Sequence, residues 1–269
     1  QPNAMGGREV GGLANMLAAH CDMKTLSTVN VKAFWQSPAM PECGGLKAVD
    51  LFSAMDAGQI KFVWIMGTNP VVSMPYREQV ESAQKKCDMV VVSDIVQSND
   101  TLAFADIALP ATGWSEKDGT VTNSERRISR QRGIMPPPGE AKHDWQIMCD
   151  VANKMGFASG FSYSHPSEIF DEHARLTAYK NDGARCLNLA RLTGKSQAQY
   201  DAMAPVQWPL TINSDKTLSA VRPFHNKVFS TPTGKANFVA VQFLPPTQVT
   251  SNAFPFVLKS GRMRDQWHT

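Results

Sequence analysis

The chain has 269 residues and a formal net charge of +3, a length that suits one large domain or two modest ones. Hydrophobic residues make up 42% and charged residues 19% of the chain, which excludes a disordered, charge-dominated polypeptide. No stretch approaches the roughly 18 consecutive apolar residues of a membrane span. A charge this small does not indicate nucleic acid. We therefore expect no membrane span and no nucleic-acid partner.

Both ends of the chain are unusual. The first residue is Gln1 rather than methionine, and residues 265–269 are a polar and aromatic string. Natural termini are commonly unremarkable in composition and loosely held. We therefore expect the sequence to be an internal fragment of a longer protein.

The five cysteines are far apart, and none forms a C-x-x-C motif. The usual spacing of a zinc knuckle or an iron–sulfur loop is therefore missing. An odd number of cysteines in a chain of this size also argues against a disulfide scaffold. The six histidines form no H-E-x-x-H motif, so we expect no metal site built from local ligands.

The chain opens with a glycine-rich entry segment, residues 1–45, whose glycines indicate close approach of the backbone to another group. Residues 46–160 then predict an α/β domain. Apolar residues at 48, 51, 52 and 55 follow the spacing of one helix face. Three near-continuous apolar runs predict strands, with helices between them. These elements cover residues 61–66, 75–86, 89–92, 101–104 and 107–109.

Strands that alternate with helices indicate a Rossmann-like, mostly parallel sheet with helices on both faces. The helix at 75–86 is expected to turn Tyr76, Val80 and Ala83 inward. Residues 111–143 are predicted to be a long polar and basic excursion that Gly119, Gly133 and residues 136–139 interrupt. A further helix begins near Asp144, with one apolar face made of Trp145, Met148, Val151, Ala152 and Met155.

The rest of the chain predicts two further regions. Residues 161–219 have weak periodicity and favour short helices and loops. Residues 220–269 change to a β pattern, with apolar runs at 238–241 and 255–258 that are typical of strands. We expect this last region to be the start of a β-barrel-like C-terminal domain.

Three glycine–lysine patterns suggest a phosphate-binding loop, and each departs from the motif. Gly6 and Gly11 have the right spacing but lack the following lysine, while Gly194-Lys195 and Gly234-Lys235 lack the first glycine. No predicted strand leads into a G-x-G-x-x-G turn either. Binding of ATP or NAD is therefore disfavoured.

Polar residues follow two of the predicted strands directly, Asn69 after the first and Ser93-Asp94 after the second. Open α/β sheets bind ligands outside the carboxyl ends of their strands. Asp94 is a candidate acceptor for ribose hydroxyls or for a guanine edge. The alternative is that Asp94 caps the N-terminus of a helix.

Charged residues after the third strand are further candidates. Lys117 could meet a phosphate or an electron-rich ring, or it could be a solvated loop lysine. Asp144 could also cap the helix that carries Trp145. Four arginines at 126, 127, 130 and 132 lack the interleaved aromatic residues of a nucleic-acid surface. We expect them to pair with acidic loops, or one of them to contact an anion.

Seven blocks resemble, in chain order, segments of bacterial assimilatory nitrate reductases, which are molybdenum enzymes of the bis-molybdopterin-guanine-dinucleotide oxidoreductase family. They are QPNAMGGREVGG (1–12), GTNP (67–70), VSD (92–94), ADIALP (105–110), EKDGTVTNSERR (116–127), FSTPTGKA (229–236) and the end of the chain, 260–269. The blocks extend over most of the chain, leaving residues 160–220 and the linkers uncovered.

The resemblance implies roles for individual residues. One guanine dinucleotide arm of the cofactor would be contacted by Asn69, Ser93, Asp94, Lys117 and Asp144. Gln1 matches a residue beside the pterin, and Arg8 matches a position near the substrate pocket. A loop that wraps the cofactor would contribute Ser260, Gly261, Arg262, Trp267, His268 and Thr269.

The resemblance also implies an activity, the two-electron reduction of nitrate to nitrite at molybdenum. The 4Fe-4S cluster and the residue that ligates molybdenum would lie upstream of Gln1, so this chain alone would be inactive; the electron donor is not identified. A bacterial cytoplasmic location is implied, with the periplasm as the alternative. Two other interpretations stay open: a formate dehydrogenase of the same family, and a non-catalytic scaffold like the large iron–sulfur subunit of NADH dehydrogenase.

Overall fold

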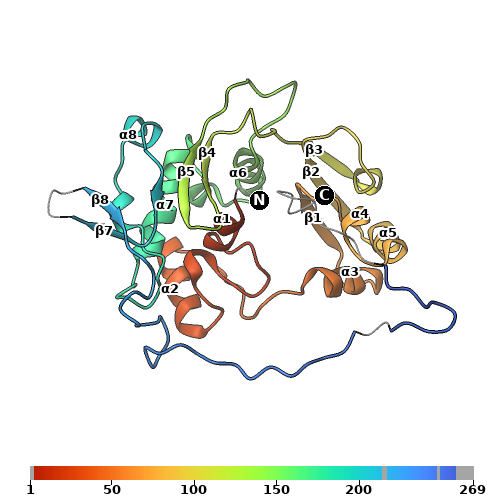
Figure 1. The fold of residues 1–269 in the computed structure, drawn as a ribbon. Helices are drawn as coiled ribbons and strands as arrows, with labels where there is room; N and C mark the ends of the chain where they lie inside the picture. Colours follow the sequence, from red (N-terminus) through yellow and green to blue (C-terminus); the bar gives the residue numbers. More distant parts are fainter. Residues whose placement is uncertain (1–2, 214–216, 247–248, 259–269) are drawn as a thin grey trace.

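The computed structural model describes residues 3–213, 217–246 and 249–258 (Figure 1). Its first unit contains a three-stranded parallel sheet in the order β1-β2-β3. The strands are β1 (Phe62–Met66), β2 (Met89–Asp94) and β3 (Ile107–Pro110). The helices are α3 (Ala48–Asp56), α4 (Pro70–Ser73), α5 (Arg77–Lys86) and the short η2 (Leu102–Phe104). The predicted parallel α/β arrangement is confirmed.

The sheet is held by an apolar cluster that forms between its strands and two helices. Val63 and Ile65 of β1 alternate between buried and more exposed neighbours, whereas β2 is buried at four successive positions. Met55 of α3 and Val80 of α5 are almost fully buried against them. Burial of Val63 and Ile65 on one face of β1 specifies the register of that strand, because a slip by one residue would turn their neighbours inward instead.

A second unit contains an antiparallel sheet of β4 (Gly119–Thr122), β5 (Arg127–Gln131) and β6 (Val206–Gln207). Its core joins Ile128 of β5 to Phe170, Leu187, Leu189 and Tyr200. The helices of this part are α1 (Ala4–Glu9), η1 (Ala18–His20), α2 (Thr25–Trp35), α7 (Pro166–Ala178), η4 (Ala190–Leu192) and α8 (Gln197–Asp201). Helix α6 (Asp144–Lys154) is followed by η3 (Ala158–Gly160).

The sequence-based expectations miss two regular elements of this second unit. The predicted polar excursion at 111–143 contains the hairpin β4–β5, which polar residues disguise because Val121 and Ile128 are its main apolar positions. The region expected to hold only short helices and loops contains α7, a helix of 13 residues. In both cases the apolar contacts that stabilise the element come from distant parts of the chain.

The details of two predicted helices also differ. Tyr76 was expected inward, but it is 72% exposed and has a φ of 57°, and α5 begins at Arg77, two residues later than predicted. The apolar face expected for α6 is wrong in part, since Met148 and Met155 are 43% and 67% exposed. Ala152 of the predicted face is buried, together with Ile147 and Cys149, which the pattern did not place there. Both faces of this helix carry apolar residues, so periodicity alone does not identify the buried one.

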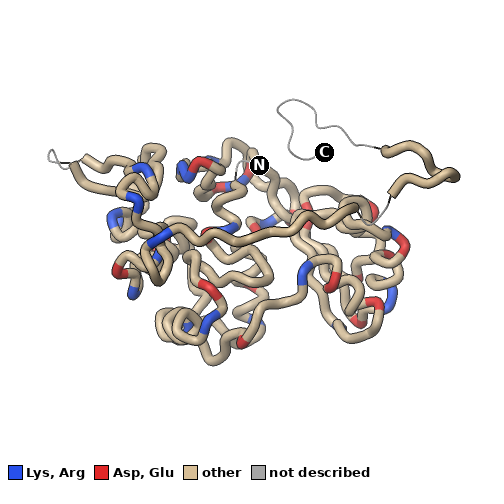
Figure 2. Tube along the Cα trace, turned by 60° about the horizontal axis from the view of Figure 1, so that its bottom comes forward, with Lys and Arg blue, Asp and Glu red and all other residues tan. Residues whose placement is uncertain are grey.

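The last part of the chain begins with the hairpin of β7 (Leu210–Ile212) and β8 (Leu218–Ala220) and continues without regular structure. The strands expected at 238–241 and 255–258 are not formed; Phe238 and Phe256 are 92% and 90% exposed. Within the described residues no segment pairs with either run, and an isolated strand cannot satisfy its backbone hydrogen bonds. Figures 1 and 2 show this segment as a long excursion along the molecule. A β domain over 220–269 stays a prediction.

In the part of the chain that the structure describes, no helix combines the length and the apolar character needed to cross a bilayer.

Candidate functional site

The end of β1 turns sharply into α4 and places Asn69 at the edge of the sheet. Gly67 follows the strand with a φ of 59°, a conformation that glycine adopts at little cost, and its amide donates to the carbonyl of Ser93 at 2.9 Å. Asn69 precedes the first residue of α4. Its Oδ1 accepts a hydrogen bond from Thr101 Oγ1 at 2.7 Å. The amide is thereby held in one orientation.

The end of β2 carries Ser93 and Asp94. Ser93 is 3% exposed, and its Oγ accepts a hydrogen bond from Trp64 Nε1 of β1 at 2.7 Å. The Asp94 carboxylate accepts from the Ile95 amide at 2.6 Å and from Asn99 Nδ2 at 2.9 Å. Asp94 therefore shapes the loop that follows β2, and the alternative that it caps a helix is wrong, since the next helical turn begins at Leu102.

The segment before α6 extends the same edge of the sheet beyond β3. Ala111 and Lys142 form a parallel bridge. The Lys142 amide donates to the Pro110 carbonyl at 3.1 Å, and Thr112 donates back to the Lys142 carbonyl at the same distance. Ala111 in turn donates to the Asp94 carbonyl at 2.9 Å. The residues after position 142 therefore leave the sheet on the side where β2 ends.

Asp144 is the first residue of α6, and its N-cap is His143. The expectation that Asp144 itself caps the helix is therefore wrong by one position. A carboxylate in the first turn still lies near the positive end of the helix dipole. Asp144 Oδ2 lies 2.6 Å from Lys117 Nζ, with side chains 41% and 33% exposed. An ion pair with this exposure contributes little stability, so a ligand could replace either partner at small cost.

Lys117 lies in a loop, residues 113–119, that is fixed by contacts on several sides. The Gly113 amide donates to Glu116 Oε2 at 2.6 Å. The Ile134 amide donates to the Ser115 carbonyl at 2.7 Å. A side chain at Gly133 would place its Cβ 2.9 Å from the Glu116 carbonyl oxygen, so only glycine allows this approach. Lys117 is therefore held by an ordered support and is not a freely solvated lysine.

The structure brings Asn69, Ser93 and Asp94 to one edge of the sheet and joins Lys117 to Asp144 beside it. It also adds residues that the sequence interpretation missed, namely Asn99, Asp100 and Thr101, which hydrogen-bond to Asn69 or Asp94. The signal that could have identified them is the polar run Ser98-Asn99-Asp100-Thr101, which directly follows the second strand loop.

Arg8 belongs to a different part of the molecule. It is an exposed residue in the last turn of α1, and among the described residues no contact joins it to the sheet edge. Helix α1 is anchored on β4, because Asn3 Oδ1 and Glu9 Oε2 accept from the Thr122 amide and hydroxyl at 2.9 and 2.8 Å. Burial raises the pKa of the Glu9 carboxyl, although its hydrogen bonds with Thr122 and Trp208 oppose the rise.

Gln1 and the candidates Ser260, Gly261, Arg262, Trp267, His268 and Thr269 lie outside the described residues. In the ranges that are described, no group of three or more His, Cys, Asp and Glu side chains could hold a metal ion.

The expectation that the arginines pair with acidic loops is confirmed for two of the four. Arg127 pairs with Glu125 at 3.4 Å, and Arg130 pairs with Asp118 and Asp201 at 2.6 and 3.0 Å.

Known proteins resemble this chain in sequence and in fold. A sequence model of the molybdopterin oxidoreductase family matches residues 4–154. The chain is 49% identical to a nitrate reductase of Klebsiella oxytoca, over 100% of this chain and 30% of that protein. It is 48% identical to a nitrate reductase of Shewanella frigidimarina, over 100% of this chain and 29% of that protein.

A more distant relative has a different name. The chain is 32% identical to an F420-dependent formate dehydrogenase subunit alpha of Methanocaldococcus jannaschii, over 100% of this chain and 37% of that protein. Acetylene hydratase from Pelobacter acetylenicus has a similar structure, with a TM-score of 0.52 over 72% of this chain and 24% of that chain. At 18% identity this likeness supports the fold alone. The chain spans 29 to 37% of the length of the three sequence relatives.

Proposed function

The chain belongs to the molybdopterin oxidoreductase family, and from this premise we propose that residues 46–160 bind one guanine dinucleotide arm of the molybdopterin cofactor. The observation that carries the proposal is the common edge formed by the ends of β1 and β2 and the Ala111–Lys142 bridge. Open α/β sheets bind their ligands outside such edges. Five candidate residues from distant segments lie at or beside this edge.

The chemistry of these residues fits the proposed ligand. Guanine presents two adjacent donors, N1–H and N2–H, and a carboxylate can accept from both. Asp144 suits this role because it is 41% exposed and its ion-pair partner, Lys117, has a long and flexible side chain that can move aside. The Lys117 ammonium suits a phosphate or the pterin edge. Asn69 and Asp94 offer oriented acceptors for ribose hydroxyls.

The activity that we propose for the longer protein is the reduction of nitrate to nitrite. The identities of 49% and 48% to nitrate reductases, against 32% to a formate dehydrogenase subunit, support nitrate over formate. When bound, the cofactor would supply two-electron chemistry at molybdenum, fed by a 4Fe-4S cluster in another part of that protein. This chain would bind and orient the cofactor. We propose the cytoplasm as the compartment.

Further residues complete the proposal. We propose Arg8 near the substrate pocket, and cofactor contacts from Gln1 and from residues 260–269.

Formate oxidation is the alternative activity, supported by the 32% identity named above. A scaffold without a cofactor is the alternative from another class, and the retained set of polar residues at the sheet edge disfavours it. Molybdenum and pterin analysis of the longer protein separates these two classes.

The guanine assignment can be tested on this chain. We expect GDP to raise the thermal unfolding midpoint more than ADP does, because the Asp144 carboxylate can accept from guanine N1–H and N2–H but adenine offers no such pair. Asp144→Asn should lower the GDP effect to that of ADP. The measurement is differential scanning fluorimetry over a nucleotide titration. Equal protection by both nucleotides would contradict the proposed guanine contact.

A matched control separates loss of binding from loss of structure. Asp150 lies on the same helix and forms a comparable exposed ion pair, with Lys142 at 2.7 Å. Asp150→Asn should leave the difference between GDP and ADP unchanged. If both variants lose it, the effect belongs to the helix as a whole and not to Asp144.

A further inference from the structure

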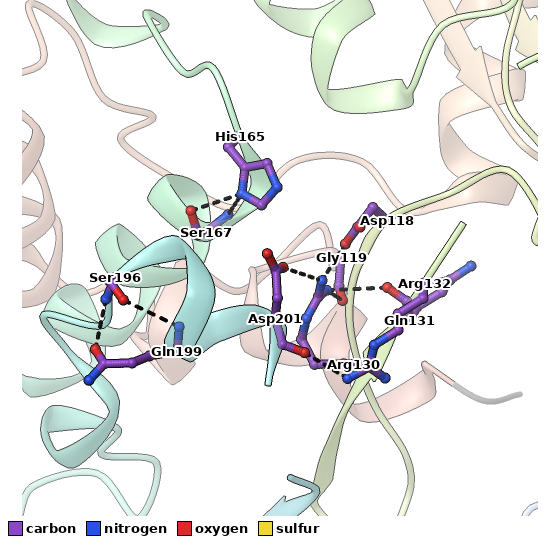
Figure 3. A network of polar contacts seen from close by, with 10 residues as sticks. All are labelled: Asp118, Gly119, Arg130, Gln131, Arg132, His165, Ser167, Ser196, Gln199 and Asp201. Carbon is purple, nitrogen blue, oxygen red and sulfur yellow. Dashed lines mark hydrogen bonds and ion pairs between the residues drawn. The ribbon is translucent and has the colours of Figure 1, made fainter. Parts of the chain in front are cut away.

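Arg130 of β5 is the most deeply buried charged side chain in the network shown in Figure 3. Its side chain is 1% exposed, and its guanidinium carbon lies 3.9 Å from the centre of the Tyr200 ring. Burial of a charge is costly unless it is paired and hydrogen-bonded. The position of Arg130 therefore depends on its partners.

Two carboxylates neutralise Arg130 through the same nitrogen, and they come from different elements. Arg130 Nη2 lies 2.6 Å from Asp118 Oδ1 and 3.0 Å from Asp201 Oδ1. Arg130 Nη1 also donates to the carbonyls of Gly119 and Gln131. Asp118 directly follows Lys117 in the chain, whereas Asp201 ends α8. One buried cation thus ties the Lys117 loop to the body of the second sheet.

We propose that Arg130 is a positioning residue for Lys117: through Asp118 and the Gly119 carbonyl it holds the 113–119 loop so that the Lys117 ammonium meets Asp144. That this position serves cofactor binding rests on the function proposed above. The guanidinium is suited to the task because its fork binds several acceptors in fixed directions. The other side of the loop is held by Gln131 Nε2, which donates to the Trp114 carbonyl at 2.9 Å.

The two acidic partners of Arg130 offer a matched pair of variants. Asp118→Asn and Asp201→Asn each remove one negative charge from the same guanidinium, and their side chains are 36% and 44% exposed. A role in stability alone would make the two variants equivalent. A positioning role makes them different, because only Asp118 belongs to the loop that carries Lys117.

The test measures how fast Lys117 is acetylated by a water-soluble N-hydroxysuccinimide ester, followed by peptide mass spectrometry on the full 269-residue chain. Asp118→Asn and Arg130→Met should each raise the rate about threefold, the scale expected when one exposed ion pair is lost. Asp201→Asn should leave it near the wild-type rate. Lys61, whose side chain is 74% exposed just before β1, is the internal reference.

The opposite charges of Asp118 and Arg130 distinguish loss of positioning from a long-range electrostatic effect. Asp118→Asn removes a negative charge and Arg130→Met removes a positive one, so a long-range field effect would move the two rates in opposite directions. Loss of positioning raises the acetylation rate of Lys117 in both variants. Arg130→Lys keeps the charge without the fork and should fall between the wild type and Arg130→Met. If Arg130→Met does not fold by circular dichroism, the pair of aspartate variants still decides.

An unchanged Lys117 rate in Asp118→Asn, or an equal rise in Asp201→Asn, would overturn the inference. This readout needs no nucleotide, so it is independent of the proposed function. The acetylation rates of Lys117 can change as expected while GDP fails to raise the unfolding midpoint of the wild type. In that case the positioning role of Arg130 is supported and the proposed guanine contact is wrong. If GDP protects, Asp118→Asn should weaken its effect and Asp201→Asn should not.

Discussion

At the scale of single residues, the buried titratable groups gather between α1, η1 and α7, away from the sheet edge. His20 and His173 each have a buried Nε2 without a hydrogen-bond partner among the described residues. Burial and, to a smaller extent, the charge of His20 together lower the pKa of His173 to about 4. The His20 pKa is itself lowered, by burial and by the nearby charges of Arg8 and Arg185. Both imidazoles are therefore neutral in the folded chain at pH 7.

This predicts a loss of stability in mild acid. A histidine whose pKa falls from 6.5 to about 4 on folding binds fewer protons in the folded state, so its contribution is present above pH 6.5 and lost toward pH 4. The loss is at most about 3 kcal/mol. Urea unfolding at pH 7.0 and 4.5 should show a smaller difference for His173→Gln than for the wild type. The pKa of Glu9 is raised in the fold, so Glu9 makes the folded state more stable as the pH falls, opposite to His173. Comparison of the wild type with His173→Gln therefore isolates the contribution of His173.

His225→Gln is the control, because His225 is an exposed residue after β8 and should leave the acid dependence as it is in the wild type. Identical acid dependence in the wild type and in His173→Gln would show that His173 does not keep its neutral form in the fold.

At the scale of elements, α6 shows where a local pattern and the tertiary structure disagree. The helix itself is predicted correctly, since Asp144 begins it and Lys154 ends it. Its buried face is not, because Ile147 is 6% exposed and its neighbour Met148 is 43% exposed.

Truncation of each residue should therefore have different effects. Ile147→Ala should lower the free energy of unfolding by about 2 to 5 kcal/mol, since it removes buried methylene groups and leaves a cavity. Met148→Ala should lower it by less than about 1 kcal/mol, as is usual for surface positions. Chemical denaturation of the two variants under identical conditions checks this. The reverse order would restore the face that periodicity predicts.

At the scale of the whole molecule, contacts between distant segments hold the second unit together. Trp208 Nε1 donates to Glu9 Oε1 at 2.6 Å, and Trp35 Nε1 donates to Glu172 Oε1 at 2.8 Å. The described residues of the segment 228–258 take no comparable part, and Lys235 is the single charged residue in the sequence of this segment. Figure 2 shows it as an almost uncharged trace along the molecule. Several of its large apolar side chains are more than four-fifths exposed, including Phe238, Val241, Phe243 and Leu258.

A chain that ends at residue 227 should therefore unfold at nearly the same temperature as the full chain, because the removed described residues bury little apolar surface. It should also aggregate less, since exposed apolar patches promote association. Differential scanning calorimetry and light scattering measure the two effects. A fall of the unfolding midpoint by more than about 4 °C, the upper scale of 1 kcal/mol in a domain of roughly 150 to 250 residues, would show that the segment supports the fold.

The sequence alone determined the parallel sheet and the membership of a molybdopterin oxidoreductase family, because both depend on local information: continuous apolar strands and short motifs at their ends. It also identified Asn69, Ser93, Asp94, Lys117 and Asp144 as one candidate set. Their roles stay predictions. Residues 260–269 lie outside the described ranges.

Only the tertiary structure decided which of these groups meet. The Lys117–Asp144 pair joins residues that are far apart along the chain, and the Arg130–Asp118 pair joins β5 to the loop that precedes β4. That hairpin has too few apolar residues to be recognised locally, and its burial comes from α7 and Tyr200. Ion pairs and buried faces depend on distances between elements, and a linear pattern does not contain those distances until the chain has packed.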